Sequence, residues 1–318
     1  MSFFWSKEGK LISASKKGSI DTVRDMLNKG VDVNSKTKTG YRYTSLIMAS
    51  SLGHIEVVDM LLAKGADPNI KGLDGLAPLH CAVLKGYKDI MGLLISNGVD
   101  VNIKGPAGVA PLHIAVGEGY KDIVDLLISN GVNVNQRTDN DMGTTALFAA
   151  FMFDFENSKL GDLANGNIDF DMMTLLLAKG ADPNIKRKND GVTVLQLASA
   201  AQQVGGVKQL LDKGANPNVK DDNGDTSLFH VIRDDDVKAN DILSALIANG
   251  ADVNVTNNAG VTPLMIASVG GYENIITMLL AEGADVSTKD NDGKTALKAA
   301  QDKGHKNIIK HLQISGAK

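Results

Sequence analysis

The sequence repeats itself, and the length of the repeat limits the folds that are open to it. The stretch APLHCAVLKGYKDIMGLLISNGVDVN (residues 77–102) recurs almost unchanged 33 positions later as APLHIAVGEGYKDIVDLLISNGVNVN (residues 110–135). Because each copy in such an array packs only on its neighbours, the period predicts a stacked repeat protein and not a globule with one central core. An apolar pair, then Gly, a small or β-branched residue and Asp or Asn mark nine copies, the last one truncated, at Gly30, Gly65, Gly98, Gly131, Gly180, Gly214, Gly250, Gly283 and Gly316.

Each copy predicts two short helices and a polar loop. In the fourth copy PLHIAV opens the first helix, and YKDIVDLLISN forms the second, with Ile123, Leu126 and Leu127 as its buried stripe. Gly131 follows the second helix, where a left-handed cap favours a residue without a β-carbon. The polar stretch VNVNQRTDNDMG then predicts an extended hairpin. One such unit cannot bury its own apolar face, so we expect each unit to be stabilised by stacking on the next.

These residues resemble the ankyrin repeat family. The resemblance rests on Thr262-Pro263-Leu264, on Ala77-Pro78-Leu79-His80, on the pairs Gly53-His54 and Gly304-His305, and on LLAKGADPN at residues 61–69 and 176–184. It extends over essentially the whole chain. It implies an all-α solenoid of helix-turn-helix pairs joined by β-hairpin-like loops, in a curved right-handed stack. It also implies that the hairpins and first helices line a concave face, which usually binds another protein.

The repeat predicts one ankyrin repeat domain over residues 1–318. We expect an N-terminal capping unit at residues 1–34, seven internal units over residues 35–287 and a C-terminal capping unit at residues 288–318. The interval from Gly131 to Gly180 is 49 residues, which predicts an insertion at about 154–168. Five of the eight Phe residues of the chain lie around this insertion. The sequence leaves open whether Phe153 and Phe155, which enter the insertion, fold back and pack within the chain or contact a partner.

Function is expected where the copies differ. Aligned on the repeat, the N-terminal half places an apolar strip with Tyr and Arg on the hairpin tips and first helices, where the C-terminal half has mostly polar or small residues such as Asp225 and Lys294. Such a strip is typical of a protein-binding groove. The alternative is that these side chains pack between adjacent hairpins. The candidate partner-binding residues are Tyr41, Arg42, Tyr43, Leu52, Leu73, Leu76, Leu84, Val109, Met142, Phe153 and Phe155.

The composition argues against catalysis and against most other ligands. With 33 basic and 37 acidic residues the net charge is −4, and no basic stripe predicts nucleic-acid binding. Cys81 is the only cysteine, which excludes an internal disulfide and cysteine-based zinc sites. Neither a phosphate-binding Gly-rich loop nor a nucleophile elbow is present. We therefore expect no catalytic residues, no metal and no cofactor.

No targeting or spanning segment is expected either. The N-terminal MSFFWSKEGK lacks the apolar stretch of a secretory signal, and no run approaches the ~20 apolar residues of a membrane helix. These features predict a cytoplasmic monomer without a membrane partner.

Several residues that could suggest a functional site are explained by structural roles. His80 and His113 stand where a side chain can bond back to the helix start, and Ala77 and Ala110 replace the capping Thr. Asp234-Asp235-Asp236 is interpreted as a solvated turn, with a basic partner or calcium as alternatives. Gly205-Gly206 is expected to shorten a second helix, and amide exchange over residues 161–206 is expected to be fast. Asn102 and Asn254 suit the turn, although they also resemble asparagine-hydroxylation sites of some ankyrin proteins.

The favoured function is a non-catalytic scaffold or interaction module that binds a partner protein through the concave surface. Two alternatives from other classes remain open at this level. One is a secreted effector or inhibitor of the bacterial type, which would act on host proteins by recruitment. The other is a self-associating architectural repeat protein.

Overall fold

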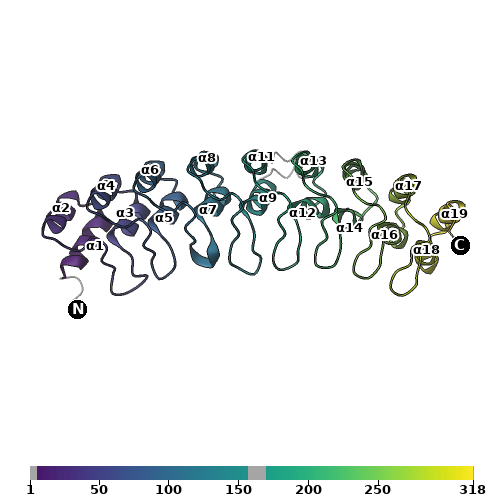
Figure 1. Ribbon diagram of the computed structural model, residues 1–318, viewed down its shortest axis with the longest axis horizontal. Helices are drawn as coiled ribbons and strands as arrows, with labels where there is room; N and C mark the ends of the chain where they lie inside the picture. Colours follow the sequence, from purple (N-terminus) through teal and green to yellow (C-terminus); the bar gives the residue numbers. More distant parts are fainter. Residues whose placement is uncertain (1–5, 157–169, 318) are drawn as a thin grey trace. The chain divides into compact units, whose positions relative to one another are not determined.

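The computed structural model describes residues 6–156 and 170–317, and for residues 153–156 the backbone alone. Contacts divide the chain into two compact units, Met1–Asn140 (unit 1) and Asp141–Lys318 (unit 2). Both units are built from antiparallel helix pairs with a long loop after each pair (Figure 1). The predicted insertion falls largely outside the described residues.

Unit 1 contains four helix pairs in its described residues. Each first helix packs on its own second helix and, within the unit, successive first helices pack on one another. The loops extend from the layer of first helices (Figure 1). The pairs are α1 (Lys7–Lys17) with α2 (Ile20–Asn28), α3 (Ser45–Leu52) with α4 (Ile55–Ala63), α5 (Pro78–Leu84) with α6 (Lys88–Ser96), and α7 (Pro111–Gly117) with α8 (Lys121–Ser129); the 3₁₀ turn η2 (Pro106–Gly108) lies in a loop.

Unit 2 repeats the same arrangement in its described residues. Its first helices contact one another in sequence, and so do most of its second helices. The pairs are α9 (Ala146–Glu156) with α11 (Asp171–Ala178), α12 (Val194–Ala200) with α13 (Val204–Asp212), α14 (Ser227–Val231) with α15 (Val237–Ala248), α16 (Pro263–Gly270) with α17 (Glu273–Ala281), and α18 (Ala296–Lys303) with α19 (Lys306–Ile314).

The core of each unit lies between the two helix layers. In α8 the buried stripe consists of Ile123, Val124 and Leu127, whereas Leu126 is only half-buried, a small correction to the predicted stripe. Ala115 of α7 is fully buried, because a small side chain lets the neighbouring helices approach closely. This interdigitation of short apolar stripes is what one repeat alone could not bury.

The polar loops are hairpin-shaped but are not strands. In the described residues, pairing of the strand type occurs only as isolated bridges, at Lys36 with Thr44 and again at Arg137 and Thr145. Most tips are closed by a main-chain hydrogen bond, for example from Gly72 N–H to the Leu76 carbonyl at 2.9 Å. Neighbouring tips are joined as well: Leu73 N–H donates to the Tyr41 carbonyl at 2.6 Å.

Asparagine side chains tie each repeat to the next. The Oδ1 of Asn102 accepts from Asn133 N–H at 2.6 Å, and its Nδ2 donates to the Gly131 carbonyl at 3.4 Å. Asn254 makes the same two bonds, to Asp285 N–H at 2.7 Å and to the Gly283 carbonyl at 3.1 Å. Both ends of the amide are therefore engaged, which gives these residues the structural role that the turn predicted. The same staple is formed by Asn34, Asn69, Asn184 and Asn218.

The expectation that Gly205-Gly206 shortens its helix is wrong. Helix α13 runs from Val204 to Asp212, nine residues like most second helices. A β-carbon at Gly206 would lie 3.1 Å from two ring atoms of Phe170, so this glycine is explained by close packing against an aromatic ring. Phe170 in turn stacks on Phe151 with ring centroids 5.6 Å apart.

Two of the three consecutive aspartates act as helix caps, and Asp234 accepts from Asp235 N–H at 2.8 Å within the loop. Asp236 accepts from Ala239 N–H at 2.7 Å and caps its own helix, α15. The carboxylate of Asp235 accepts from Asn274 N–H at 3.1 Å and Ile275 N–H at 3.2 Å, in the first turn of the neighbouring α17. Carboxylates at helix N-termini satisfy free N–H groups and interact favourably with the helix dipole.

Candidate partner-binding surface

Most of the exposed large apolar side chains in the described residues lie on loop tips and first helices, and Ile55, Val237 and Ile314 lie on second helices. Tyr41 and Leu73 retain 60% and 69% of their accessible surface, although apolar residues of this size are usually covered. They lie on neighbouring tips that are joined by the main-chain bond described above. Leu52 and Leu84, at the ends of α3 and α5, are also exposed. Unit 1 therefore presents aromatic and aliphatic groups on the side where the sequence predicted them.

A pair of tyrosines fixes the first of these tips. Tyr41 and Tyr43 are stacked, with ring centroids 5.6 Å apart. The hydroxyl of Tyr43 donates to the carboxylate of Asp74 on the next tip. Partial burial and this hydrogen bond raise the pKa of Tyr43 well above its usual value. A β-carbon at Gly72 would lie 2.5 Å from the Tyr43 ring, so the tyrosine packs directly on the neighbouring loop. Tyr43 holds the tip, and Tyr41 faces solvent.

Arg42 has a left-handed backbone conformation, which is unfavourable for an arginine. Its φ is 53°, in the left-handed region, where side chains other than Gly and Asn are strained. Arg42 stands two residues before the cap of a first helix. In the other loops the residue at this position is a Gly with positive φ: Gly75, Gly108, Gly143, Gly191, Gly224, Gly260 and Gly293. Strain retained at an exposed position is an observation from which function can be hypothesised.

The remaining predicted residues divide into two groups. Leu76 and Val109 are half-buried in their loops, as packing between adjacent hairpins would require. Met142 is exposed but belongs to unit 2. Phe153 and Phe155 lie at the end of α9, and their side chains are outside the described residues. Within the described residues, the strip is therefore best represented by Tyr41, Arg42, Tyr43, Leu52, Leu73 and Leu84.

The histidines make structural contacts. His80 Nδ1 accepts from Ala77 N–H at 3.1 Å, and its Nε2 lies 3.2 Å from the Val109 carbonyl on the next loop. Burial lowers the pKa of His80 to about 4, consistent with a neutral ring that accepts at Nδ1 and donates at Nε2. His54 Nε2 lies 3.1 Å from the Lys16 carbonyl, and His305 Nε2 lies 3.1 Å from the Val269 carbonyl. These rings connect neighbouring repeats.

The thiol of the chain is buried, and the possible metal-binding side chains of the described residues do not form a cluster. Cys81 is buried, and burial raises the pKa of its thiol to about 11. A thiol with so high a pKa is a poor nucleophile at neutral pH. The described residues contain no group of three or more His, Cys, Asp or Glu side chains that could hold a metal ion. In the same residues, every helix is too short or too polar to cross a membrane.

A concave feature of unit 2 did not follow from the sequence. A depression of about 310 Å³ lies between α16 and α18 and the loops that precede them. Its apolar lining includes Val261, Ile266 and Val269, and Lys294 and Asp302 stand at its charged rim. In the sequence, Lys294 made this part of the C-terminal half look polar. The apolar lining comes from two adjacent repeats at once, so it becomes visible only when both are stacked.

Comparison with known proteins agrees with this architecture. A family model described as ankyrin repeats, in three copies, matches residues 11–105, 79–159, 162–254 and 235–318. No curated protein matches the chain. Ankyrin repeats are generally protein–protein interaction modules and are typically non-catalytic. The matches cover nearly the whole chain, which therefore belongs to the ankyrin repeat family.

Proposed function

We propose that this protein is a non-catalytic interaction module that holds a partner protein on the loop tips and first helices of unit 1. The observation that carries the proposal is the exposure of Tyr41 and Leu73 on adjacent, mutually bonded tips. Leu52 and Leu84 extend the apolar area on α3 and α5. Met142, Phe153 and Phe155 stay candidates for further contacts made by unit 2.

The energetics favour this role for the exposed pair. Aromatic and apolar anchors dominate the binding energy of protein interfaces, and burying apolar surface contributes roughly 25 cal/mol per Å². The Tyr41 ring is already held by its stack on Tyr43, so little side-chain entropy is lost when a partner covers it. The backbone bond between the two tips also presents Leu73 in a fixed position. The surface is thus prepared for binding before the partner arrives.

A reducing compartment suits a chain whose single thiol is buried, and we place the protein in the cytoplasm. The alternatives of a secreted effector and of an architectural protein that associates with itself both need the same apolar surface. They differ from the favoured function in the identity of the partner, a host protein in the first case and a second copy of the chain in the second.

The test is capture of the partner with a matched pair of variants. Tyr41→Ser combined with Leu73→Ser removes both anchors and keeps the main-chain bond between the tips. Val237→Ser is the control, because Val237 is 75% exposed but begins α15, a second helix of unit 2. Wild type and control, immobilised in a lysate of the source cells, are expected to retain a protein that the double variant loses, as read by quantitative mass spectrometry. Equal retention by all three would refute the proposed surface.

A further inference from the structure

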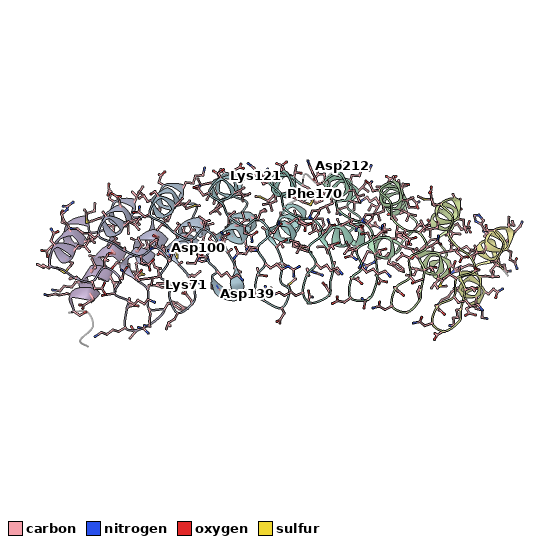
Figure 2. The ribbon with its side chains drawn as sticks, viewed as in Figure 1. Lys71, Asp100, Lys121, Asp139, Phe170 and Asp212 are labelled. Atoms are coloured by element: carbon pink, nitrogen blue, oxygen red, sulfur yellow. The ribbon has the colours of Figure 1, made fainter. Side chains whose placement is uncertain are left out.

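The loops of unit 1 carry an excess of positive charge, even though the whole chain is acidic. The loop segments 35–44, 68–77, 101–110 and 134–140 contain six basic and two acidic side chains. Figure 2 shows two of the labelled loop residues, Lys71 and Asp139, on the loops that extend from the first helices. The basic residues are Lys36, Lys38, Arg42, Lys71, Lys104 and Arg137.

Both acidic side chains in these loops are engaged by neighbours. Asp74 accepts from the hydroxyl of Tyr43 and from Leu76 N–H at 3.2 Å. Asp139 forms an ion pair with Lys104 at 2.7 Å. Within the described residues, no hydrogen bond or ion pair involves the guanidinium of Arg42 or the ammonium of Lys71, and both residues are exposed. The positive charge beside the apolar tips is therefore available to a ligand.

The second helices of the same unit have the opposite sign. Helices α2, α4, α6 and α8 together contain seven acidic and three basic residues. Unit 1 is thus polarised between a basic loop side and an acidic outer side. Such a distribution orients an incoming charged partner toward the loops and repels it from the outer helices.

Arg42 is the residue at which charge, strain and apolar surface meet. It lies between Tyr41 and Tyr43, and its left-handed backbone is strained at a position that Gly fills in the other loops. Stability is often lost where function needs a particular side chain. A guanidinium presents fixed donors that match a carboxylate in bidentate geometry.

We propose that the loop tips of unit 1 bind an acidic segment of a partner protein, one that places Asp or Glu beside large aliphatic or aromatic side chains. In this arrangement, Arg42 and Lys71 contact the carboxylates, and Tyr41 and Leu73 contact the apolar side chains. This inference rests on the proposed function and adds the chemistry of the partner. Nucleic acid fits less well, because aliphatic Leu73, Leu52 and Leu84 have no counterpart in a phosphate backbone and the outer helices are acidic.

The experiment is a selection of random displayed peptides on the immobilised full-length chain at physiological salt. We expect the enriched pool to be more acidic and more apolar than the starting pool. The most enriched peptide is then synthesised with a fluorescent label, together with a twin in which every Asp and Glu is replaced by Asn and Gln. The twin is expected to bind about tenfold more weakly than the acidic peptide. Added salt is expected to weaken binding of the acidic peptide and to leave binding of the twin unchanged.

Charge variants of the protein assign the effect to the loops. Arg42→Gln with Lys71→Gln should weaken the acidic peptide about tenfold, since two charge contacts are lost. The matched control is Lys29→Gln with Lys64→Gln, which removes the same charge at the C-caps of α2 and α4 and should leave affinity unchanged. Arg42→Gly should also weaken binding while raising the melting temperature, because it removes both the charge and the strain.

The outcomes separate this inference from the proposed function. Neutral or basic enriched peptides whose binding is lost in the Tyr41→Ser, Leu73→Ser variant would overturn the acidic partner and support the binding surface. Enriched peptides that bind the double variant as tightly as the wild type would overturn both the acidic partner and the binding surface. A selection that enriches no peptide would do the same. Tight binding of a labelled DNA strand that is lost in Arg42→Gln with Lys71→Gln would overturn the acidic segment in favour of nucleic acid.

Discussion

At the residue scale, the chain carries two versions of the same helix cap. In α12 Thr193 accepts from Gln196 N–H at 3.3 Å, and Gln196 accepts from Thr193 N–H at 2.7 Å. The amide of Gln196 also donates to the Asp225 carbonyl of the next loop at 2.7 Å. In α5 His80 takes the place of Gln196 and makes the corresponding contacts to Ala77 and Val109. The α5 cap lacks the hydroxyl bond because Ala77 has no side-chain oxygen.

Restoring this hydroxyl is expected to stabilise the protein. Ala77→Thr should raise the free energy of unfolding by about 1 kcal/mol, the usual value of an N-cap bond. Thr44 and Thr262 fit equally buried positions of other repeats and form this bond, so the added atoms have room. The melting temperature measures the effect, and Ala77→Val is the control that adds the same volume without the oxygen. Equal gains from Thr and Val would attribute the effect to packing.

The neutral state of His80 predicts a loss of stability in acid. Its pKa in the folded chain is about 4, below the unfolded value of about 6.5, so the unfolded chain binds the proton more tightly. The contribution is complete above the unfolded pKa and disappears as the pH falls from about 6.5 toward about 4, a change on the order of 3 kcal/mol. Urea unfolding at about pH 7 and at about pH 4.5 measures it.

His80→Gln is the control, because Gln196 already makes these bonds in α12 and cannot titrate. The difference in unfolding free energy between wild type and this variant isolates His80 from the acidic residues. If that difference is the same at both pH values, the folded ring is protonated as readily as the unfolded one.

At the element scale, the sequence predicted which segments are helical but not how each is packed. The repeat period predicted the helix pairs, and PLHIAV was expected to open a first helix, which does begin at Pro111. The role of Gly206 could not be predicted, since it depends on contact with Phe170, the residue that precedes α11 in the previous repeat. The capping role of Asp235 could not be predicted either, because the helix that it caps lies about forty residues farther along the chain. Fast amide exchange near the insertion stays a prediction.

The two adjacent glycines of α13 are expected to respond oppositely to Ala. Gly205→Ala meets no atom within 4 Å and should stabilise the chain by roughly 0.5–1 kcal/mol through helix propensity. Gly206→Ala pushes against the fully buried Phe170 ring and should destabilise it by about 1 kcal/mol, as overpacked cores do. Thermal unfolding followed by circular dichroism distinguishes them. Stabilisation by both would mean that Phe170 moves freely.

At the scale of the whole molecule, the binding surface could be predicted only in part. Exposure of Tyr41, Leu73 and Leu84 followed from their repeat positions. The half-burial of Leu76 and Val109 did not, because it depends on the shape of each loop. The depression beside Val269 needed two stacked repeats to become visible. Residues that act alone were therefore predictable, and residues that act through a neighbouring repeat were not.

The chain is expected to be a monomer until it meets its partner. Multi-angle light scattering should give a mass near 33.6 kDa that does not change with concentration. A mass that rises with concentration in the wild type but not in the Tyr41→Ser, Leu73→Ser variant would show that the apolar tips pair with each other. That result would support the self-associating architectural protein.

The asparagine staples have a mechanical consequence. Asn34, Asn69 and Asn102 each reach only to the repeat that follows, so no side-chain amide of this kind spans two junctions. All junctions of unit 1 would carry a tension applied along it, and each could open without opening the next. The segment would lengthen gradually, link after link, and would close again in the reverse order when the tension is released.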